Sequence, residues 1–454
     1  MFETHNPATA EALETYTTHD AEAVETRLAA AADAFDDWRD VSIEERTEAA
    51  AELATGLRER TDEFARLMTR EMGKPITQAR SEVEKCAWLC EYYAERAPEH
   101  LQDDRIGTEP GVKSFVTYEP LGPVLAIMPW NYPFWQVFRF AVPALTAGNV
   151  ALLKHSPTTL GCGEAIADLF EDAGYPSACL QTLRVDTDRV STVIEDARVA
   201  AVTLTGSTRA GRAVARQAGE QLKKTVLELG GSDPYIVLDD ADVSAAAETG
   251  VLARTQNSGQ SCIAAKRLFV HTDVYDQFRE AFLDGMADLT VGDPTDEATD
   301  VGPQARGDLL EELHEQVTAS VEAGATVALG GEPLDRPGHF YQPTVLTDVP
   351  RDCPATTEEL FGPVATLVEV DSEAEAIRRA NDTTYGLSAS IWTTDRERGE
   401  RVAREIDAGA AYVNELSKSD PRLPFGGIGD SGYGTELSEH GIKEFTNEKT
   451  IWIQ

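Results

Sequence analysis

The chain has 454 residues, in which 40 Lys and Arg against 79 Asp and Glu give a formal net charge of −39. This length predicts about two or three domains, each with a core of its own. At this charge, Coulomb repulsion opposes binding to phosphate backbones and to anionic lipid surfaces, so we expect neither nucleic acid nor a membrane as a partner. The hydrophobic fraction of 42 % and its regular periodicity predict a folded protein.

The acidic residues are spread along the whole chain, and only ten of the 40 basic residues are Lys. Such a surface suits concentrated salt, where the Debye length falls to about 3 Å at 1 M and self-repulsion is screened. We therefore expect a halophilic source and folding that depends on salt.

The chain shows no sign of export or membrane insertion. Met1–His5 has no basic character, and no apolar run follows it. The most apolar stretch, Val124–Leu145, is interrupted by three prolines and by Arg139, which argues against a membrane-spanning helix. Six cysteines without a C-x-x-C pair predict neither a disulfide framework nor a metal site. The sequence thus predicts a cytoplasmic protein.

The spacing of apolar residues in the first hundred residues differs from their spacing in the segment that follows. Residues 20–97 are rich in Ala and repeat apolar residues at spacings of three and four, which predicts a layer of helices. Residues 114–118 alternate like a half-exposed strand, whereas 124–128 form a continuous apolar run typical of a buried parallel strand.

From residue 150 onward, strand-like and helix-like segments alternate, as in a parallel sheet with helices on both faces. The first series has expected strands at 150–153, 180–185, 199–204 and 225–229, and helices near 160–172, 187–195 and 208–219. A second series runs from about 235 to 420, with strands near 268–271, 365–370, 388–392 and 411–413. The fold class is therefore α/β, with two such domains.

The last stretch, 448–454, alternates like an edge strand. Together with 114–119 it is expected to form an arm that pairs with another subunit. We accordingly expect a homodimer or a homotetramer.

The strongest candidate for chemistry is the cysteine that ends the run Asn257-Ser258-Gly259-Gln260-Ser261-Cys262, a loop that leads into an apolar strand. Backbone N–H groups in such a loop can stabilise an oxyanion and favour the thiolate of Cys262, which would make it a nucleophile. A lone cysteine is more often ordinary packing, so its neighbours decide the interpretation.

Two further side chains follow the ends of predicted parallel strands, where active-site residues collect. Glu228 can serve there as a general base toward water, and Asn131 offers a side-chain donor to an oxyanion. The plain alternatives are a solvated glutamate at the strand end and a turn residue between prolines.

Another strand end indicates an anion site. The apolar run 199–204 ends in Thr205-Gly206-Ser207-Thr208 and opens a helix. Gly206 permits close backbone approach, and Ser207 or Thr208 can cap free N–H groups, so the helix start can bind an anion. A plain strand-to-helix turn is the alternative.

Seven motifs resemble the aldehyde dehydrogenase superfamily in order and spacing, over nearly the whole chain. They are Pro129-Trp130-Asn131, Lys154-His155-Ser156-Pro157, Thr205-Gly206-Ser207, Glu228-Leu229-Gly230-Gly231, Gly259-Gln260-Ser261-Cys262, Glu359-Leu360-Phe361-Gly362-Pro363 and Pro424-Phe425-Gly426-Gly427. Within the family, the segments 228–234 and 256–266, with 133–136 upstream, look most like bacterial NAD(P)-dependent succinate-semialdehyde dehydrogenases.

This resemblance implies an aldehyde dehydrogenase-like α/β fold with three parts. A Rossmann-type dinucleotide-binding domain would comprise residues 1–101 and 120–230, and an α/β catalytic domain residues 231–427. A β-strand oligomerisation arm would comprise residues 102–119 and 428–454.

The resemblance also implies residue roles. Cys262 would attack the aldehyde carbon, Asn131 would hold the oxyanion, and Glu228 would activate the water that hydrolyses the thioester. The cofactor, NAD or NADP, would be contacted by Trp130, Lys154, Ser156, Pro157, Gly206, Ser207, Leu229, Glu359 and Phe361.

Cofactor preference stays open at this stage. Many NAD-preferring members have a Glu at the position of Pro157, where it binds the ribose 2′-hydroxyl and repels a 2′-phosphate. Without that acid NADP is not excluded, and Lys154 with Ser156 could accept its phosphate.

An anionic substrate needs a cation at the pocket mouth, and Arg139, Lys418 and Arg422 are candidates by their position near the Asn131 and Pro424 motifs. A structural salt bridge explains Lys418 equally well. The predicted activity is oxidation of a small carboxylate-bearing aldehyde to its acid, with succinate semialdehyde first and other short semialdehydes next. The alternatives are a general aliphatic aldehyde dehydrogenase, a CoA-acylating relative, which usually lacks the general-base Glu, and a noncatalytic binding or structural protein on the same fold.

Overall fold

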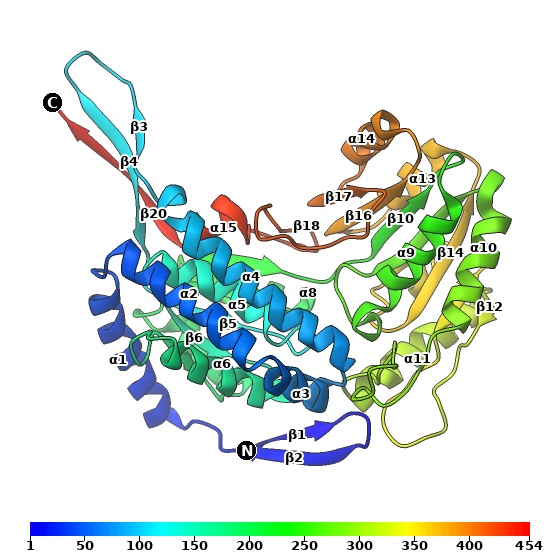
Figure 1. Ribbon diagram of the computed structural model, residues 1–454, viewed down its shortest axis with the longest axis horizontal. Coiled ribbons are helices and arrows are strands. Elements are labelled where there is room, and N and C mark those ends of the chain that lie inside the picture. Colours follow the sequence, from blue (N-terminus) through cyan, green and yellow to red (C-terminus); the bar gives the residue numbers. More distant parts are fainter.

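Two parallel sheets organise the computed structural model, which describes residues 1–454 (Figure 1). The first sheet has six strands in the order β19-β9-β8-β5-β6-β7, all parallel except β19. Its strands are β5 (Pro123–Ile127), β6 (Val150–Lys154), β7 (Leu180–Thr182), β8 (Ala201–Thr205), β9 (Lys224–Glu228) and β19 (Gly432–Tyr433). The predicted first α/β series is confirmed.

Helices cover both faces of this sheet, and the predicted helical layer before residue 100 is confirmed. The helices are α1 (Ala21–Trp38), α2 (Ile43–Glu59), α3 (Thr61–Met72), α4 (Ile76–His100), α5 (Trp135–Thr146), η1 (Pro157–Thr159), α6 (Leu160–Asp172), α7 (Thr187–Glu195) and α8 (Thr208–Glu220). Local sequence sets their starts: at α2 the Ser42 side chain accepts from Glu45 N–H while the Glu45 carboxylate accepts from Ser42 N–H. One continuous hydrophobic core joins these helices to the sheet.

The second sheet has seven strands in the order β12-β13-β14-β11-β10-β16-β17, parallel except for β12. Its strands are β10 (Asp233–Val237), β11 (Ala265–His271), β12 (Thr326–Leu329), β13 (Thr344–Thr347), β14 (Val364–Val370), β16 (Ser388–Trp392) and β17 (Ala410–Val413). Its helices are α9 (Val243–Thr255), η2 (Gln256–Gly259), α10 (Thr272–Ala287), α11 (Gly307–Glu322), α12 (Pro354–Thr357), α13 (Glu373–Ala380) and α14 (Arg396–Glu405).

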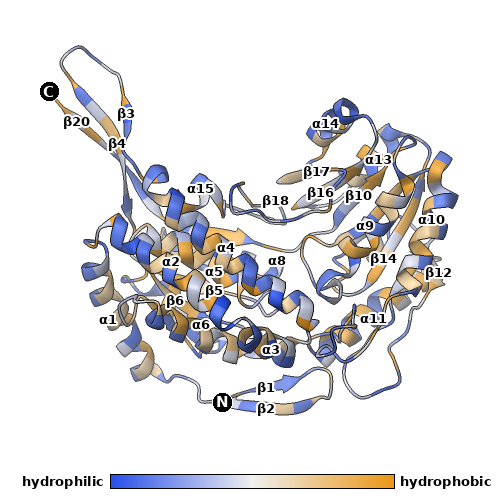
Figure 2. Cartoon of the chain, viewed as in Figure 1, coloured by the Kyte–Doolittle hydropathy of each residue, from blue (hydrophilic) through white to orange (hydrophobic).

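The inner strands β10, β13 and β16 of the second sheet are buried on both faces, which explains their mostly apolar sequences. On β10, Tyr235 and Val237 pack with residues of α9 and α10, whereas Ile236 and Leu238, which directly follows the strand, pack with residues of α13 and α14. Figure 2 shows the result: hydrophobic colour concentrates in the sheets and on the inner faces of the helices.

An arm projects from the first half of the molecule and carries the C-terminus at its tip (Figure 1). It consists of β3 (Asp104–Ile106), β4 (Lys113–Pro120) and β20 (Thr446–Ile453). The short helix α15 (Ser438–Lys443) comes directly before β20. β20 runs antiparallel to β4, from Thr446 opposite Pro120 to Ile453 opposite Lys113. The two segments predicted to form an arm therefore pair with each other, and their pairing with another subunit stays a prediction.

Two small sheets were not predicted. An N-terminal hairpin joins β1 (Phe2–Asn6) to β2 (Glu11–Tyr16), and β15 (Tyr385–Gly386) pairs with β18 (Ile428–Gly429). β19 belongs to the segment assigned to the arm but pairs with β9, and the proposed domain boundaries stay a prediction. Among the helices, none combines the length and apolar character that crossing a bilayer requires.

Candidate active site

The carboxyl ends of β5, β8 and β9 meet at one edge of the first sheet, because these strands are neighbours and parallel. Glu228 is the last residue of β9, and only Leu229–Ser232 separate it from β10 in the second sheet. Gly206 directly follows β8, and Asn131 follows β5 after a short loop. The site therefore lies where the chain crosses from one sheet to the other.

The loop before Cys262 has an unusual backbone. Asn257 and Ser258 both have φ of 56°, and Gly259 has φ of 75°, so three successive residues are in the left-handed region. At Gly259 a Cβ would stand 2.3 Å from the main chain of Gly362, so only glycine fits. Hydrogen bonds hold the other two: Asn257 Nδ2 donates to the Asn131 carbonyl at 2.7 Å, and Gly302 N–H donates to Ser258 Oγ at 2.9 Å. Strain of this kind persists only where surrounding contacts fix the backbone.

Three side chains fix the carbonyl groups of this loop. Lys266 Nζ donates to the main-chain oxygens of Ser261 at 2.9 Å and Cys262 at 2.7 Å. Asn131 Nδ2 donates to the Gln260 carbonyl at 3.1 Å. Arg254, fully buried on α9, donates to the carbonyls of Gly259 at 3.3 Å and Leu360 at 3.0 Å. The cysteine loop is thereby joined to the segment that carries Glu359 and Phe361.

Cys262 is the one cysteine that is not fully buried; the other five are packed in the interior. Burial raises the pKa of its thiol to about 12, against smaller opposite effects of Lys266 and Arg139. The loop alone therefore does not favour the thiolate, contrary to our expectation, and a base must take the proton.

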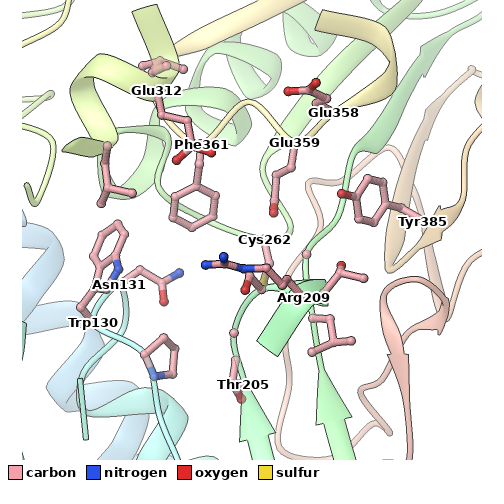
Figure 3. Close-up of a pocket in the computed structure, with 18 of the residues that line it drawn as sticks. Trp130, Asn131, Thr205, Arg209, Cys262, Glu312, Glu358, Glu359, Phe361 and Tyr385 are labelled. Atoms are coloured by element: carbon pink, nitrogen blue, oxygen red, sulfur yellow. The ribbon is translucent and has the colours of Figure 1, made fainter. Parts of the chain in front are cut away.

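A cavity of about 420 Å³ opens on one side of Cys262 (Figure 3). It is lined by 20 residues, among them Trp130, Asn131, Gly206, Ser207, Arg209, Leu229, Cys262, Glu312, Glu358, Glu359 and Phe361. Six of the nine residues predicted to contact the cofactor, and two of the three predicted catalytic residues, thus share one cavity.

The chemistry of this wall fits a dinucleotide. α8 starts there, with Ser207 as its N-cap, so free N–H groups and the Arg209 cation face an anion from one side. Glu359 Oε1 accepts from Gly231 N–H at 3.1 Å and lies 3.4 Å from Lys266 Nζ, which places a carboxylate where ribose hydroxyls can donate. The Trp130 and Phe361 rings meet edge to face, with centroids 5.7 Å apart, and give the cavity an apolar side.

Lys154, Ser156 and Pro157 do not line this cavity. Lys154 ends β6 opposite Ile127 of β5, and Ser156 Oγ accepts from Thr158 N–H at 3.3 Å at the start of η1. They lie at the same edge of the sheet, and their contacts to a cofactor stay a prediction.

A second cavity, of about 340 Å³, opens on the other side of Cys262. Only Cys262 and Gln136 border both cavities. The remaining wall is formed by Lys74, Gln78, Ser81, Glu82, Lys85, Tyr132, Trp135, Arg139, Leu252, Gln256, Ser261, Ile263, Leu416, Ser417, Lys418, Ser419 and Phe425. A thiol with one cavity on each side can contact two different molecules at once.

The three predicted substrate cations have different surroundings. Arg139 lines the second cavity but forms a buried ion pair with Glu436. Lys418 lines it too, half exposed and paired with Glu415 at 2.7 Å. Arg422 lines neither cavity and is paired with Asp420 at 2.6 Å; its substrate role stays a prediction.

Glu228 is buried and lines neither cavity. Its Oε2 lies 3.9 Å from the Arg139 guanidinium, and its Oε1 has no hydrogen-bond partner. Burial raises the pKa of this carboxyl well above its usual range; Arg139 lowers it and Glu436 raises it further. A buried carboxyl of this kind is a candidate for proton transfer near neutral pH.

Two residues of the site, Lys266 and Arg254, were not predicted from the sequence. Lys266 is one of only ten lysines and lies at the start of β11, shortly before the apolar run Leu268–Val270, so its charge could have been noticed. Arg254 lies on α9, a helix without a separate prediction from the sequence, and nothing local to it indicates that it reaches the carbonyls around residue 360.

Comparisons with known proteins identify the family of the chain. The model of the aldehyde dehydrogenase family matches residues 1–451. A probable NADP-dependent succinate-semialdehyde dehydrogenase of Synechocystis is 49 % identical over 450 residues, covering 99 % of both chains. An NAD(P)-dependent succinate semialdehyde dehydrogenase of Escherichia coli is 47 % identical over 447 residues, covering 98 % of this chain and 96 % of its own.

The solved structures include succinic semialdehyde dehydrogenase of Streptococcus pyogenes in complex with NADP⁺, which is 37 % identical and superposes with a TM-score of 0.98 over 100 % of both chains. An NAD-dependent aldehyde dehydrogenase of Sinorhizobium meliloti is 34 % identical, with a TM-score of 0.97 over 100 % of this chain and 91 % of its own. Because a family model spans almost the whole chain and the fold and motifs agree with it, the protein belongs to the aldehyde dehydrogenase family.

Proposed function

We propose that this aldehyde dehydrogenase oxidises succinate semialdehyde to the dicarboxylic acid with NAD or NADP as the oxidant. The observation that carries the proposal is the position of Cys262, whose thiol borders a cofactor-type cavity on one side and a cation-lined cavity on the other. The names of the relatives that span the whole chain support the substrate.

In the first half of the reaction, Cys262 sulfur bonds to the aldehyde carbon and the carbonyl electron pair moves to oxygen. The thiol proton passes to solvent water as the carbon–sulfur bond forms, since burial keeps the free thiol neutral. The oxyanion accepts hydrogen bonds from Cys262 N–H and from Asn131 Nδ2, whose second hydrogen is not used by the Gln260 carbonyl. A nicotinamide cofactor held by the residues that line the first cavity would supply the hydride acceptor, and loss of hydride from the substrate carbon would leave a thioester on Cys262.

In the second half, water hydrolyses this thioester. Glu228 takes a proton from the attacking water, the carbon–sulfur bond breaks, and the acid leaves. Because Glu228 lines neither cavity here, its side chain has to rotate away from Arg139 to reach that water.

Most of the residues that could hold the cofactor line the first cavity. The start of α8, with Gly206, Ser207 and Arg209, suits the pyrophosphate, and Glu359 suits a ribose. Trp130, Leu229 and Phe361 supply apolar contacts. Lys154, Ser156 and Pro157 are proposed for the adenosine end, where Pro157 carries no charge against a 2′-phosphate.

The arm β3–β4–β20 is proposed to join subunits into a homodimer or homotetramer. Its side chains Ile106 and Trp452 are 52 % and 50 % exposed, which suits a surface that another subunit covers. We place the enzyme in the cytoplasm.

The test is reduced-nicotinamide formation from succinate semialdehyde in molar salt, with NAD and NADP in parallel, by the wild type and Cys262→Ala. Cysteine-dependent turnover without CoA is the expected result. Turnover only with CoA would identify a CoA-acylating enzyme. No turnover, together with a thiol at Cys262 inert to alkylation, would identify a noncatalytic protein.

A further inference from the structure

The second cavity is lined by four cationic side chains, and one of them differs from the rest. Lys85 on α4 forms no ion pair with any carboxylate of the chain, although the protein has 79 acidic residues. The other three are each paired: Lys74 with Glu82, Arg139 with Glu436, and Lys418 with Glu415.

The direct contacts of Lys85 are neutral, and the carboxylates of Glu82 and Asp420 act on it only from beyond ion-pair distance. Its Nζ donates to Ser419 Oγ at 2.8 Å and lies 4.3 Å from the centroid of the Trp135 ring. Burial is the main cause that lowers the pKa of Lys85, to about 8, and the nearby Arg139 lowers it as well. A largely desolvated charge without a counter-ion is costly, so this cation is suited to an anion that arrives from outside the chain.

The position of Lys85 places that anion in the second cavity. Gln78, Ser81, Glu82 and Lys85 follow each other at helical spacing and line the cavity from one face of α4. Opposite them, Trp135 contacts Lys85, and its neighbour Gln136 borders both cavities beside Cys262. One continuous wall therefore leads from the thiol to the Lys85 ammonium.

We propose that Lys85 binds the distal carboxylate of the aldehyde substrate and so selects short aldehydes that carry an acid at the far end. The ammonium has three donors, of which Ser419 uses one, so two remain for a carboxylate. This inference rests on the proposed function and specifies which residue recognises the substrate. Arg139 and Lys418 are already paired with carboxylates of the chain, whereas Lys85 is free to bind the carboxylate of the substrate.

The test compares Lys85→Met with the wild type on two substrates of equal carbon number, succinate semialdehyde and butanal. An ion pair with hydrogen bonds is lost only for the semialdehyde, so its kcat/KM should fall by about 10- to 100-fold, mostly through KM. The kcat/KM for butanal should stay within about threefold, which also shows that the variant is folded. Lys85→Arg should restore part of the preference, and Lys449→Met on the arm controls for the loss of one positive charge.

The outcomes separate the two proposals. If the wild type does not turn over succinate semialdehyde, or prefers butanal, the proposed substrate is wrong. If the wild type prefers the semialdehyde and Lys85→Met keeps that preference, the role of Lys85 is wrong. Loss of the preference in Lys418→Met, with Lys85→Met unaffected, would assign the recognition to Lys418 instead.

Discussion

Lys266 donates a hydrogen bond of 2.7 Å to the main-chain carbonyl of Cys262, the residue whose thiol the proposed reaction uses. The same ammonium binds the Ser261 carbonyl and lies 3.4 Å from Glu359, which lines the first cavity. It therefore orients the backbone that presents the nucleophile and adds positive charge beside the sulfur.

Lys266→Met should make the thiol harder to ionise. The lost charge raises the pKa of Cys262 further, so alkylation by iodoacetamide at a fixed pH should slow by about tenfold, the effect of one pKa unit. The measurement is the alkylation rate across a pH series, with Lys224→Met, an exposed lysine paired with Glu444, as the control. An unchanged pH profile would mean that Lys266 serves packing alone.

The raised pKa of Glu228 predicts a pH dependence of the second half-reaction. Below its pKa, at about 8, the carboxyl is protonated and cannot accept a proton from water, so thioester hydrolysis should speed up as pH rises through this value and then level off. In Glu228→Gln the first-turnover burst of reduced nicotinamide should remain, while steady-state turnover falls by about 100-fold or more and loses this pH dependence. Rapid-mixing absorbance measures both phases, and a variant without a burst would contradict the assignment.

Pro157→Glu should reduce the use of NADP selectively. A carboxylate at the start of η1 would repel a 2′-phosphate, so KM for NADP should rise by at least about tenfold, while KM for NAD stays within about threefold. Steady-state kinetics with both cofactors measures the ratio. Equal effects on the two cofactors would place the 2′-phosphate elsewhere.

The buried pair of Lys74 and Glu82 predicts a large effect on stability. Glu82→Gln keeps an acceptor for the N–H groups of Phe134 and Trp135 but leaves the Lys74 charge uncompensated. The free energy of unfolding should fall by about 3–5 kcal/mol. Glu84→Gln, on the same helix but in an exposed pair with Arg58, should cost less than about 1 kcal/mol. Urea unfolding of both variants measures the two losses in the free energy of unfolding. Similar losses would show that the uncompensated charge of Lys74 does not determine the effect.

The net charge of −39 predicts a dependence on salt. At about 0.1 M salt the Debye length is near 10 Å and surface carboxylates repel each other, whereas at about 1 M they are screened. The melting temperature and the activity should therefore rise as potassium chloride is added to molar concentration. A protein that is equally stable and active without molar salt would exclude the halophilic interpretation.

The parts of the site that the sequence could predict lie at strand ends. Parallel neighbouring strands end at one edge of a sheet, so the residues that follow β5, β8 and β9 had to meet once the α/β rhythm was recognised. The family motifs also predict Cys262, Trp130 and Phe361 as site residues, and these three residues line the first cavity together.

The missed features are contacts between residues far apart in the chain. Arg139 was expected at the pocket mouth, but its partner Glu436 lies near the C-terminus, and no local pattern reveals an ion pair of this kind. Lys85 has the spacing of an ordinary charged position on an amphipathic helix, and only the packing of α4 against α5 shows that it faces a cavity. The N-terminal hairpin was missed as well, because neither strand is long or apolar enough to stand out.

Gln136 and Cys262 stand between the two cavities, so the thiol can be reached from two separate sides. A dinucleotide and an aldehyde that approach the thiol from opposite sides do not block each other, so neither has to bind first for steric reasons. The acid can also depart through its own opening while the reduced cofactor is still in place. Widening one opening to admit bulkier aldehydes should therefore leave the affinity for the dinucleotide unaltered, which makes the α4 side of the molecule the natural place to redesign its substrate range.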